Sequence, residues 1–154
     1  MTYKRRPLFA DENNVDLLRS AFRYAMDRKP FDLGAIVILP DHVHCIWSMT
    51  NDVYYSKRWQ MIIKTHFSRK MDVPINLHGV KQVWQPRFWE HCIRDDNDYQ
   101  RHIDYIHYNP VKHGFVPSVK DWPHSSFQRF VKKGWYEENW GQNIESDVLS
   151  MDVE

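Results

Sequence analysis

Cysteine is scarce in this chain of 154 residues, which contains two. Cys45 and Cys92 lack the paired spacing of a Cys-x-x-Cys motif. Two isolated cysteines do not form the disulfide framework of small secreted domains or a four-cysteine zinc site. Both lie in segments predicted to be strands, so we expect two reduced, buried thiols.

Long apolar runs are also absent. No stretch approaches the roughly 20 apolar residues of a membrane-spanning helix, and the basic residues of 1–7 precede no apolar segment of a signal peptide. We therefore expect a cytoplasmic protein with no membrane partner. Repeats and low-complexity segments are missing too. The length favours one domain over residues 1–141, followed by an acidic tail, 142–154, expected to be disordered.

The net charge of +1 conceals a strong asymmetry along the chain. Residues 1–134 contain all 21 lysines and arginines but 14 acidic residues, whereas residues 135–154 contain six acidic residues and no lysine or arginine. The main part of the chain is therefore basic, and only its end is acidic.

The stretch 57–94 concentrates this basic character. It has eight lysines and arginines against two acidic residues, interleaved with aromatic side chains. Cations that contact phosphates, together with rings on which bases stack, are typical of a groove for single-stranded nucleic acid. The alternative is a solvated helix face with aromatic residues in the core. Of Trp84, Phe88 and Trp89, we expect at least two to pack in the core.

Hydrophobic periodicity and turn residues predict mixed secondary structure. Helices are expected at about 14–29, 56–71 and 96–109, with a short helix ending near 133, and strands at 33–39, 42–49, 83–85 and 88–94. Helices combined with an antiparallel hairpin indicate an α+β fold, a small sheet covered on one face by helices.

The second arm of the predicted hairpin contains a His-x-His motif. Side chains alternate between the faces of a strand, so His42 and His44 point the same way. Two imidazoles on one face are half of a metal site, although a lone motif of this kind is more often a matter of packing.

The predicted helix that precedes Pro110 supplies two further candidates. Tyr105 and Asn109 lie four residues apart, one above the other on one helical face, and we expect Pro110 to end the helix. The buried stripe of this helix is predicted from Tyr99, Ile103 and Ile106. Tyr105 and Asn109 are therefore expected to lie off the side that faces the core.

Together these residues suggest a catalytic metal ion beside a nucleophile. Two histidine nitrogens and one amide oxygen leave coordination positions open for substrate, and this donor set allows Mg²⁺ or Mn²⁺ better than Zn²⁺. A tyrosine hydroxyl is a poor nucleophile without such help. Tyr108 is a rival nucleophile, but the residue four positions later is Lys112, which is no metal ligand.

These motifs, joined to their surroundings, resemble a known family. His42-Val43-His44 with Tyr105-x-x-x-Asn109 resembles the HUH single-tyrosine transposases. Four strings closely resemble the REP-associated branch of that superfamily over about residues 2–141: LPDHVHCIW, RFWEHCIRDDNDY, YIHYNPVKHGFV and DWPHSS.

The resemblance implies a ferredoxin-like α+β fold of the HUH-endonuclease type, with the tyrosine helix laid across the histidine strand. It implies that His42, His44 and Asn109 bind a divalent metal, Mg²⁺ or Mn²⁺, and that Tyr105 attacks DNA. The implied substrate is single-stranded or hairpin DNA from repeated palindromic elements, cut and rejoined through a 5′-phosphotyrosine. It also implies a protein associated with the bacterial nucleoid and a monomer, with a dimer as in the wider superfamily as the alternative. Residues expected to contact DNA are Arg58, Lys64, Arg69, Lys70, Arg87, Arg94 and Lys112.

The chain departs from the family pattern at its start. Family members usually have an additional strand, inside the sheet, ahead of the sequence that begins here at Met1. Three explanations stay open: a mis-assigned start, pairing of residues 1–9 in place of that strand, and a decayed copy. The alternative function is accordingly a shortened, catalytically weak relative that binds hairpin elements without cutting them. A metallohydrolase of small molecules is a third possibility, weakened by the lack of a general base.

Overall fold

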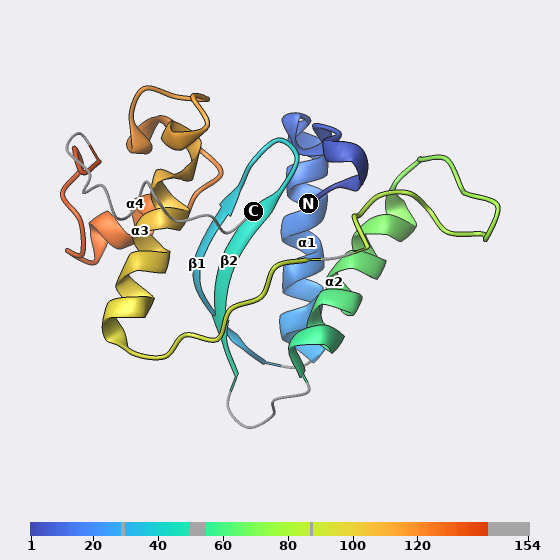
Figure 1. Ribbon diagram of the computed structural model, residues 1–154, viewed down its shortest axis with the longest axis horizontal. Coiled ribbons are helices and arrows are strands. Elements are labelled where there is room, and N and C mark those ends of the chain that lie inside the picture. The colour runs from blue at the N-terminus through green and yellow to red at the C-terminus, as the bar shows by residue number, and fades with distance from the viewer. Residues whose placement is uncertain (29, 50–54, 87, 142–154) are drawn as a thin grey trace. The chain divides into compact units, whose positions relative to one another are not determined.

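A two-stranded antiparallel hairpin contains the two histidines of the His-x-His motif (Figure 1). Its strands are β1 (Asp32–Ile38) and β2 (Val43–Ser48). His42 immediately precedes β2, and His44 is the second residue of that strand. This computed structural model describes residues 1–28, 30–49, 55–86 and 88–141, without the side chains of 55–60.

Four α-helices accompany the hairpin in the described parts of the chain. They are α1 (Glu12–Arg28), α2 (Tyr55–Lys70), α3 (Asp96–Lys112) and α4 (Phe127–Lys132). Short 3₁₀ turns occur at Tyr3–Arg5, Leu8–Ala10 and Val119–Asp121. The predicted helices and the hairpin are found within a few residues of their expected positions, and the α+β class is confirmed. None of the helices described is both long and apolar enough to cross a membrane.

The chain divides into two units, interleaved in sequence. Unit 1 comprises Met1–Asp32, Pro40–His42 and Trp47–Phe88, and unit 2 comprises Leu33–Leu39, Val43–Ile46 and the chain from Trp89 onward. The expectation of one domain over 1–141 stays a prediction, and the tail 142–154 lies outside the described residues.

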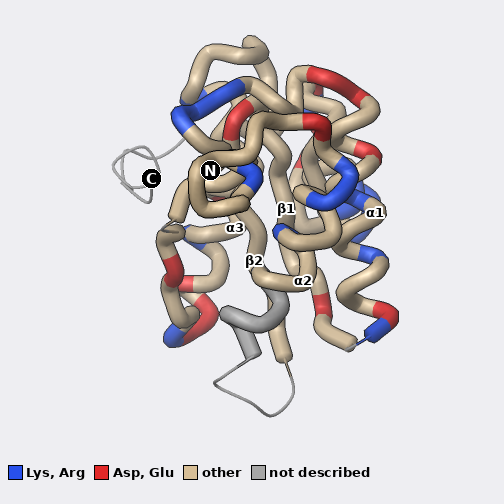
Figure 2. Tube along the Cα trace, turned by 90° about the vertical axis from the view of Figure 1, so that its right-hand side faces the viewer, with Lys and Arg blue, Asp and Glu red and all other residues tan. Residues whose placement is uncertain are grey.

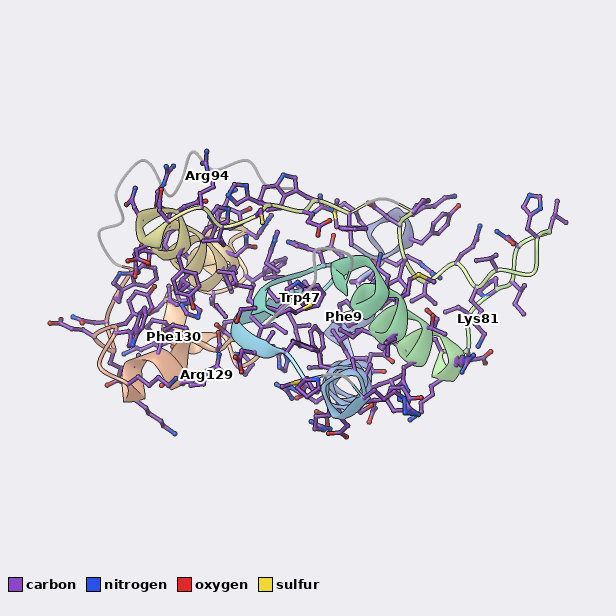
Figure 3. The ribbon with its side chains drawn as sticks, turned by 90° about the horizontal axis from the view of Figure 1, so that it is seen from below. Phe9, Trp47, Lys81, Arg94, Arg129 and Phe130 are labelled. Carbon is purple, nitrogen blue, oxygen red and sulfur yellow. The ribbon has the colours of Figure 1, made fainter. Side chains whose placement is uncertain are left out.

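In unit 1, α1 packs along α2 (Figure 1). Acidic and basic positions interleave along α1 (Figure 2), while its apolar stripe is buried. Phe9, Phe67 and Trp84 form an aromatic cluster with ring centroids 5.3 to 5.8 Å apart. Lys81 lies at the C-terminal end of α2 (Figure 3), where its Nζ donates to the carbonyl oxygens of Arg69 and Met71. A cation at this position complements the negative end of the helix dipole.

The N-terminal residues pair with a distant segment of unit 1. Thr2 forms an isolated antiparallel bridge with Trp84, and its backbone N–H donates to the carbonyl oxygen of Asp41 at 2.8 Å. Residues 1–3 therefore pair with residues 83–85, but they do not replace the family's additional strand, because the described sheet consists of β1 and β2. The strand predicted at 83–85 is reduced to this bridge, and no regular strand exists at 88–94, where the predicted strand is wrong. Cys92, expected to be buried there, is exposed, whereas burial of the Cys45 thiol in β2 raises its pKa to about 12.

The core of unit 2 lies between the hairpin and α3. Alternate residues of the β1 segment pack against the stripe Ile103 and Ile106, together with residues from the C-terminal part of the unit. The outer edge of β1 is paired by residues 124–126, because Ile38 N–H donates to the His124 carbonyl and Ser126 N–H donates to the Ile36 carbonyl, both at 2.8 Å. The DWPHSS string thus protects a strand edge.

Helix α3 begins as predicted but ends later than Pro110. Its N-cap is Asp95, whose side chain accepts a hydrogen bond from Asp98 N–H at 2.8 Å. The helix passes through Pro110 and continues to Lys112, so the prediction that Pro110 ends it is wrong. Proline removes one hydrogen bond, but the turn that follows closes with bonds of its own: Phe115 N–H donates to the Pro110 carbonyl and Gly114 N–H donates to that of Val111. Gly114, at φ +70°, provides the left-handed residue that this ending requires.

Candidate functional site

In unit 1, His42 is held by the acidic residue beside it. Its Nδ1 lies 2.6 Å from a carboxylate oxygen of Asp41, and the other oxygen accepts from Arg5 Nε at 2.7 Å. Burial raises the pKa of Asp41, but the hydrogen bonds with His42 and Arg5 outweigh it and hold this pKa below its usual value. The ionised carboxylate makes Nδ1 a donor, so in the neutral form of the ring the lone pair is on the buried Nε2.

In unit 2, His44 contacts the candidate nucleophile. The rings of His44 and Tyr105 meet edge to face, with centroids 5.4 Å apart and planes at 85°. Lys112 Nζ lies 3.3 Å from the Tyr105 hydroxyl and 4.6 Å from the centre of its ring. The structure therefore brings together the second histidine, the tyrosine and one lysine predicted to bind DNA.

Asn109 is completely buried on α3, one turn after Tyr105. Among the described residues, neither its amide oxygen nor its amide nitrogen has a hydrogen-bond partner. A buried amide without partners costs stability, so such a group calls for an explanation. One explanation is a divalent cation that takes the amide oxygen as a ligand. The buried, unpartnered amide of Asn109 therefore fits a metal site.

The expectation that Tyr105 and Asn109 lie off the core-facing side is wrong. Tyr105 is 2% exposed and Asn109 is fully buried. The cause is that the second half of α3 is covered on more than one face: His107, between them in sequence, packs against rings of α4 and against Tyr136. The rival Tyr108 is half-buried against the core of unit 2.

The cations predicted to contact DNA differ in exposure. Arg69, Lys70, Arg94 and Lys112 are exposed, whereas Lys64 is half-buried, with its ammonium against Trp84 and Phe88, and burial lowers its pKa. Lys64, one of the residues expected to contact DNA, therefore packs against aromatic rings. Arg87 and the side chain of Arg58 lie outside the described residues.

The three aromatic residues of the basic stretch also differ in exposure. Trp84 packs in the core of unit 1, whereas Phe88 and Trp89 are 40% and 49% exposed. The expectation that at least two of the three pack in the core is therefore wrong. Exposed rings at 88 and 89 are compatible with stacking on bases.

Sequence reasoning missed two members of the site, Asp41 and Arg5. Asp41 follows Pro40 in the turn between β1 and β2. A carboxylate directly before a histidine is a local signal for an oriented imidazole. The role of Arg5 has no such signal, because 36 positions separate it from Asp41.

Comparisons with known proteins identify relatives of this chain. The model of a family described as "Transposase IS200 like" matches residues 1–109. The "REP-associated tyrosine transposase" of Escherichia coli (strain K12) is 44% identical over 129 residues, which cover 83% of this chain and 73% of that protein. The "Putative REP-associated tyrosine transposase" of Haemophilus influenzae is 44% identical over 137 residues, covering 84% and 77%.

A solved structure gives the same result for the fold. It is described as a REP-associated tyrosine transposase bound to a REP hairpin, and it matches with a TM-score of 0.77 and 42% sequence identity. The match covers 92% of this chain and 80% of that chain. The resemblance inferred from the four strings is thereby confirmed, as is the fold class.

Proposed function

The chain belongs to the family of IS200-like transposases, and on that premise we propose that it cuts and rejoins single-stranded or hairpin DNA through Tyr105. In the first step the Tyr105 oxygen bonds to phosphorus and the bond from phosphorus to the 3′ oxygen breaks. The phenolic proton passes to that 3′ oxygen, which leaves as a hydroxyl. Attack by a 3′ hydroxyl on the phosphotyrosine reverses the step and joins strands.

The surroundings of Tyr105 are the observation that carries the proposal. An imidazole in a T-shaped contact with its ring and an ammonium 3.3 Å from its hydroxyl hold the phenol in one orientation. A fixed nucleophile loses less entropy when it reaches the transition state. We propose that Lys112 both positions the phenolic oxygen and attracts the phosphate under attack.

His42, His44 and Asn109 are the residues that would hold Mg²⁺ or Mn²⁺. The metal would supply Lewis-acid polarisation of the phosphodiester. Asp41 would keep His42 in the tautomer that ligates through Nε2. The metal would also bind the amide oxygen of Asn109, which has no hydrogen-bond partner among the described residues.

A second function is favoured by the burial of Tyr105. With 2% of its surface exposed, the phenol is covered as the chain stands, which suits a relative that binds hairpin elements without cutting them. The exposed cations Arg69, Lys70, Arg94 and Lys112 serve binding in either case.

Covalent capture of DNA distinguishes cleavage through Tyr105 from binding without cutting. We expect the chain, incubated with Mn²⁺ and labelled hairpin oligonucleotides from the repeats flanking its gene, to form an adduct that survives denaturing electrophoresis. Tyr105→Phe should abolish the adduct while changing the Kd for DNA little, because only the attacking oxygen is lost.

Tyr108→Phe is the matched control, three residues away on the same helix, and should retain the adduct. An adduct that persists in Tyr105→Phe and vanishes in Tyr108→Phe would transfer the role to Tyr108. Tight, unmodified binding by the unaltered chain would establish the binding relative instead.

A further inference from the structure

A second group of metal-ligating side chains lies in unit 2, apart in sequence from the His-x-His motif. His91 Nε2 is 2.7 Å from one carboxylate oxygen of Asp98, and His102 Nδ1 is 3.1 Å from the other. One donor atom from each of the three residues lies within 4.8 Å of the others. His91 comes from the segment ahead of α3, whereas Asp98 and His102 lie one turn apart on that helix.

These separations suit a tetrahedral ion. Zn²⁺ binds histidine nitrogen and carboxylate oxygen at about 2.0 to 2.2 Å, so neighbouring ligands in a tetrahedral site lie roughly 3.3 to 3.5 Å apart. One donor atom from each residue already lies within 4.8 Å of the other two, so side-chain movements of roughly 1 Å bring the three to these separations. The two imidazole planes are nearly parallel, 7° apart with centroids at 4.6 Å, so the rings stack on each other beside the carboxylate.

The surroundings hold the three side chains in place. The backbone N–H of Arg94 donates to Asp98 Oδ2 at 3.0 Å, and the ring of Trp89 stacks on both imidazoles at 16° and 21°. Hydrogen bonding from His91 is the main cause that holds the pKa of Asp98 below its usual value, so the carboxylate is ionised. Ordered outer contacts of this kind orient metal ligands and raise their affinity.

One competing charge lies beside the carboxylate. Arg94 Nε is 3.4 Å from Asp98 Oδ2, but the Arg94 side chain is 76% exposed and at the surface (Figure 3). An ion pair this exposed is weak. The guanidinium can turn into solvent when a cation arrives.

We propose that His91, Asp98 and His102 bind one zinc ion, separate from the ion proposed at His42, His44 and Asn109. Two imidazoles with a single carboxylate favour zinc over the harder Mg²⁺. Three protein ligands leave the fourth position to water. The ion fastens the segment 89–94 to the first turns of α3, the helix that contains Tyr105.

Zinc retention by the full chain tests the site without any assay of DNA cleavage. The starting protein is His42→Gln/His44→Gln, which lacks the other histidine pair. It is stripped with chelator, loaded with excess Zn²⁺ and desalted, and its metal is measured by mass spectrometry. We expect about one zinc per chain, because the proposed site binds one ion, and a Tm raised by zinc because the ion binds only folded protein.

Adding His91→Gln or His102→Gln should reduce the retained zinc to near none and remove the rise in Tm. Adding His78→Gln, at an exposed histidine of unit 1, should change neither. Two different histidines are altered so that a folding defect in one variant, visible by circular dichroism in chelator, leaves the other informative. The proposal is overturned if the starting protein retains no zinc, or if the His91 and His102 variants retain as much as it does.

Discussion

At the scale of single residues, the candidate site depends on which nitrogen of an imidazole bears the proton. Asp41 accepts from Nδ1 of His42 at 2.6 Å and is itself paired with Arg5. The side chain of Arg5 is half exposed, whereas that of Asp41 is mostly buried. Asp41 should therefore contribute to metal affinity through His42, and Arg5 should contribute much less.

We expect Asp41→Asn to weaken Mn²⁺ binding by about 10- to 100-fold, as loss of an outer partner of a ligating histidine typically does. The asparagine keeps the size of the side chain but removes the charge that fixes the tautomer. Isothermal titration of Mn²⁺ into the metal-free chain measures the effect.

Arg5→Ala is the control, since it removes the ion pair and leaves the contact between Asp41 and His42. An equal loss of affinity in Arg5→Ala would show that the fold of this turn, and not the orientation of the ring, controls binding.

His107 should make the stability of the chain depend on pH. Burial, with a smaller effect of Arg129, lowers the pKa of His107 to about 3. Below the usual pKa of about 6.5, the unfolded chain binds a proton that the folded chain does not. The free energy of unfolding should therefore fall as pH falls from about 6.5, by up to about 1.4 kcal/mol per pH unit.

Urea unfolding between pH 7.5 and 5 measures that slope. His107→Gln should flatten it, whatever its effect on stability at pH 7.5, whereas the exposed His78→Gln should leave it unchanged. A slope that is the same in His107→Gln would mean that other groups bind the proton.

At the scale of elements, α3 positions most of the candidate site and has a defined end. It tolerates Pro110 in its last turn because the following residues close that turn with the pair of hydrogen bonds to the Pro110 and Val111 carbonyls. Lys112, which reaches Tyr105, is the last residue of the helix. The position of Lys112 therefore depends on how α3 ends.

Gly114→Ala should destabilise the chain by about 1 to 2 kcal/mol, because a side chain disfavours the left-handed backbone at φ +70°. Nothing lies within 4 Å of the position of an added Cβ, so the cost is conformational and not steric crowding. Gly114→Asn should cost less, since asparagine tolerates this conformation. Chemical unfolding compares the two, and equal losses would argue against a backbone origin.

At the scale of the whole molecule, the net charge of +1 conceals the basic character of residues 1–134. Arg69 and Lys70, exposed at the end of α2, are the described cations of the 57–70 helix region best placed to meet phosphate. Lys64, by contrast, serves packing. The choice of residues for a test of DNA binding thus follows from exposure.

Arg69→Glu combined with Lys70→Glu should weaken DNA binding and reduce the dependence of the binding constant on salt, because fewer counterions are released. Binding is measured from roughly 50 to 200 mM salt. Lys132→Glu with Lys133→Glu makes the same change of charge at exposed positions in and after α4, and should affect the slope less. If the α4 pair has the larger effect, the DNA surface lies on unit 2.

Local patterns were sufficient for much of the fold and to select the candidate site residues, whose roles stay predictions. Helical spacing located α1, α2 and α3, and alternation along residues 33–49 located the hairpin. The His-x-His motif and the spacing of Tyr105 and Asn109 are equally local, since both follow from one element's own periodicity. The family resemblance rests on such strings, and the comparisons confirm it.

Burial and long-range partners were not predictable in this way. Tyr105 and Asn109 are buried because several segments cover α3. The hydrophobic periodicity of the helix predicts only one buried face. Residues 88–94 lack a strand although their composition suits one, because no neighbouring segment pairs with them in the described structure. Arg5 reaches Asp41, and His91 reaches Asp98 and His102, through folding of the chain in three dimensions: each contact depends on where separate segments come together, which no local spacing encodes.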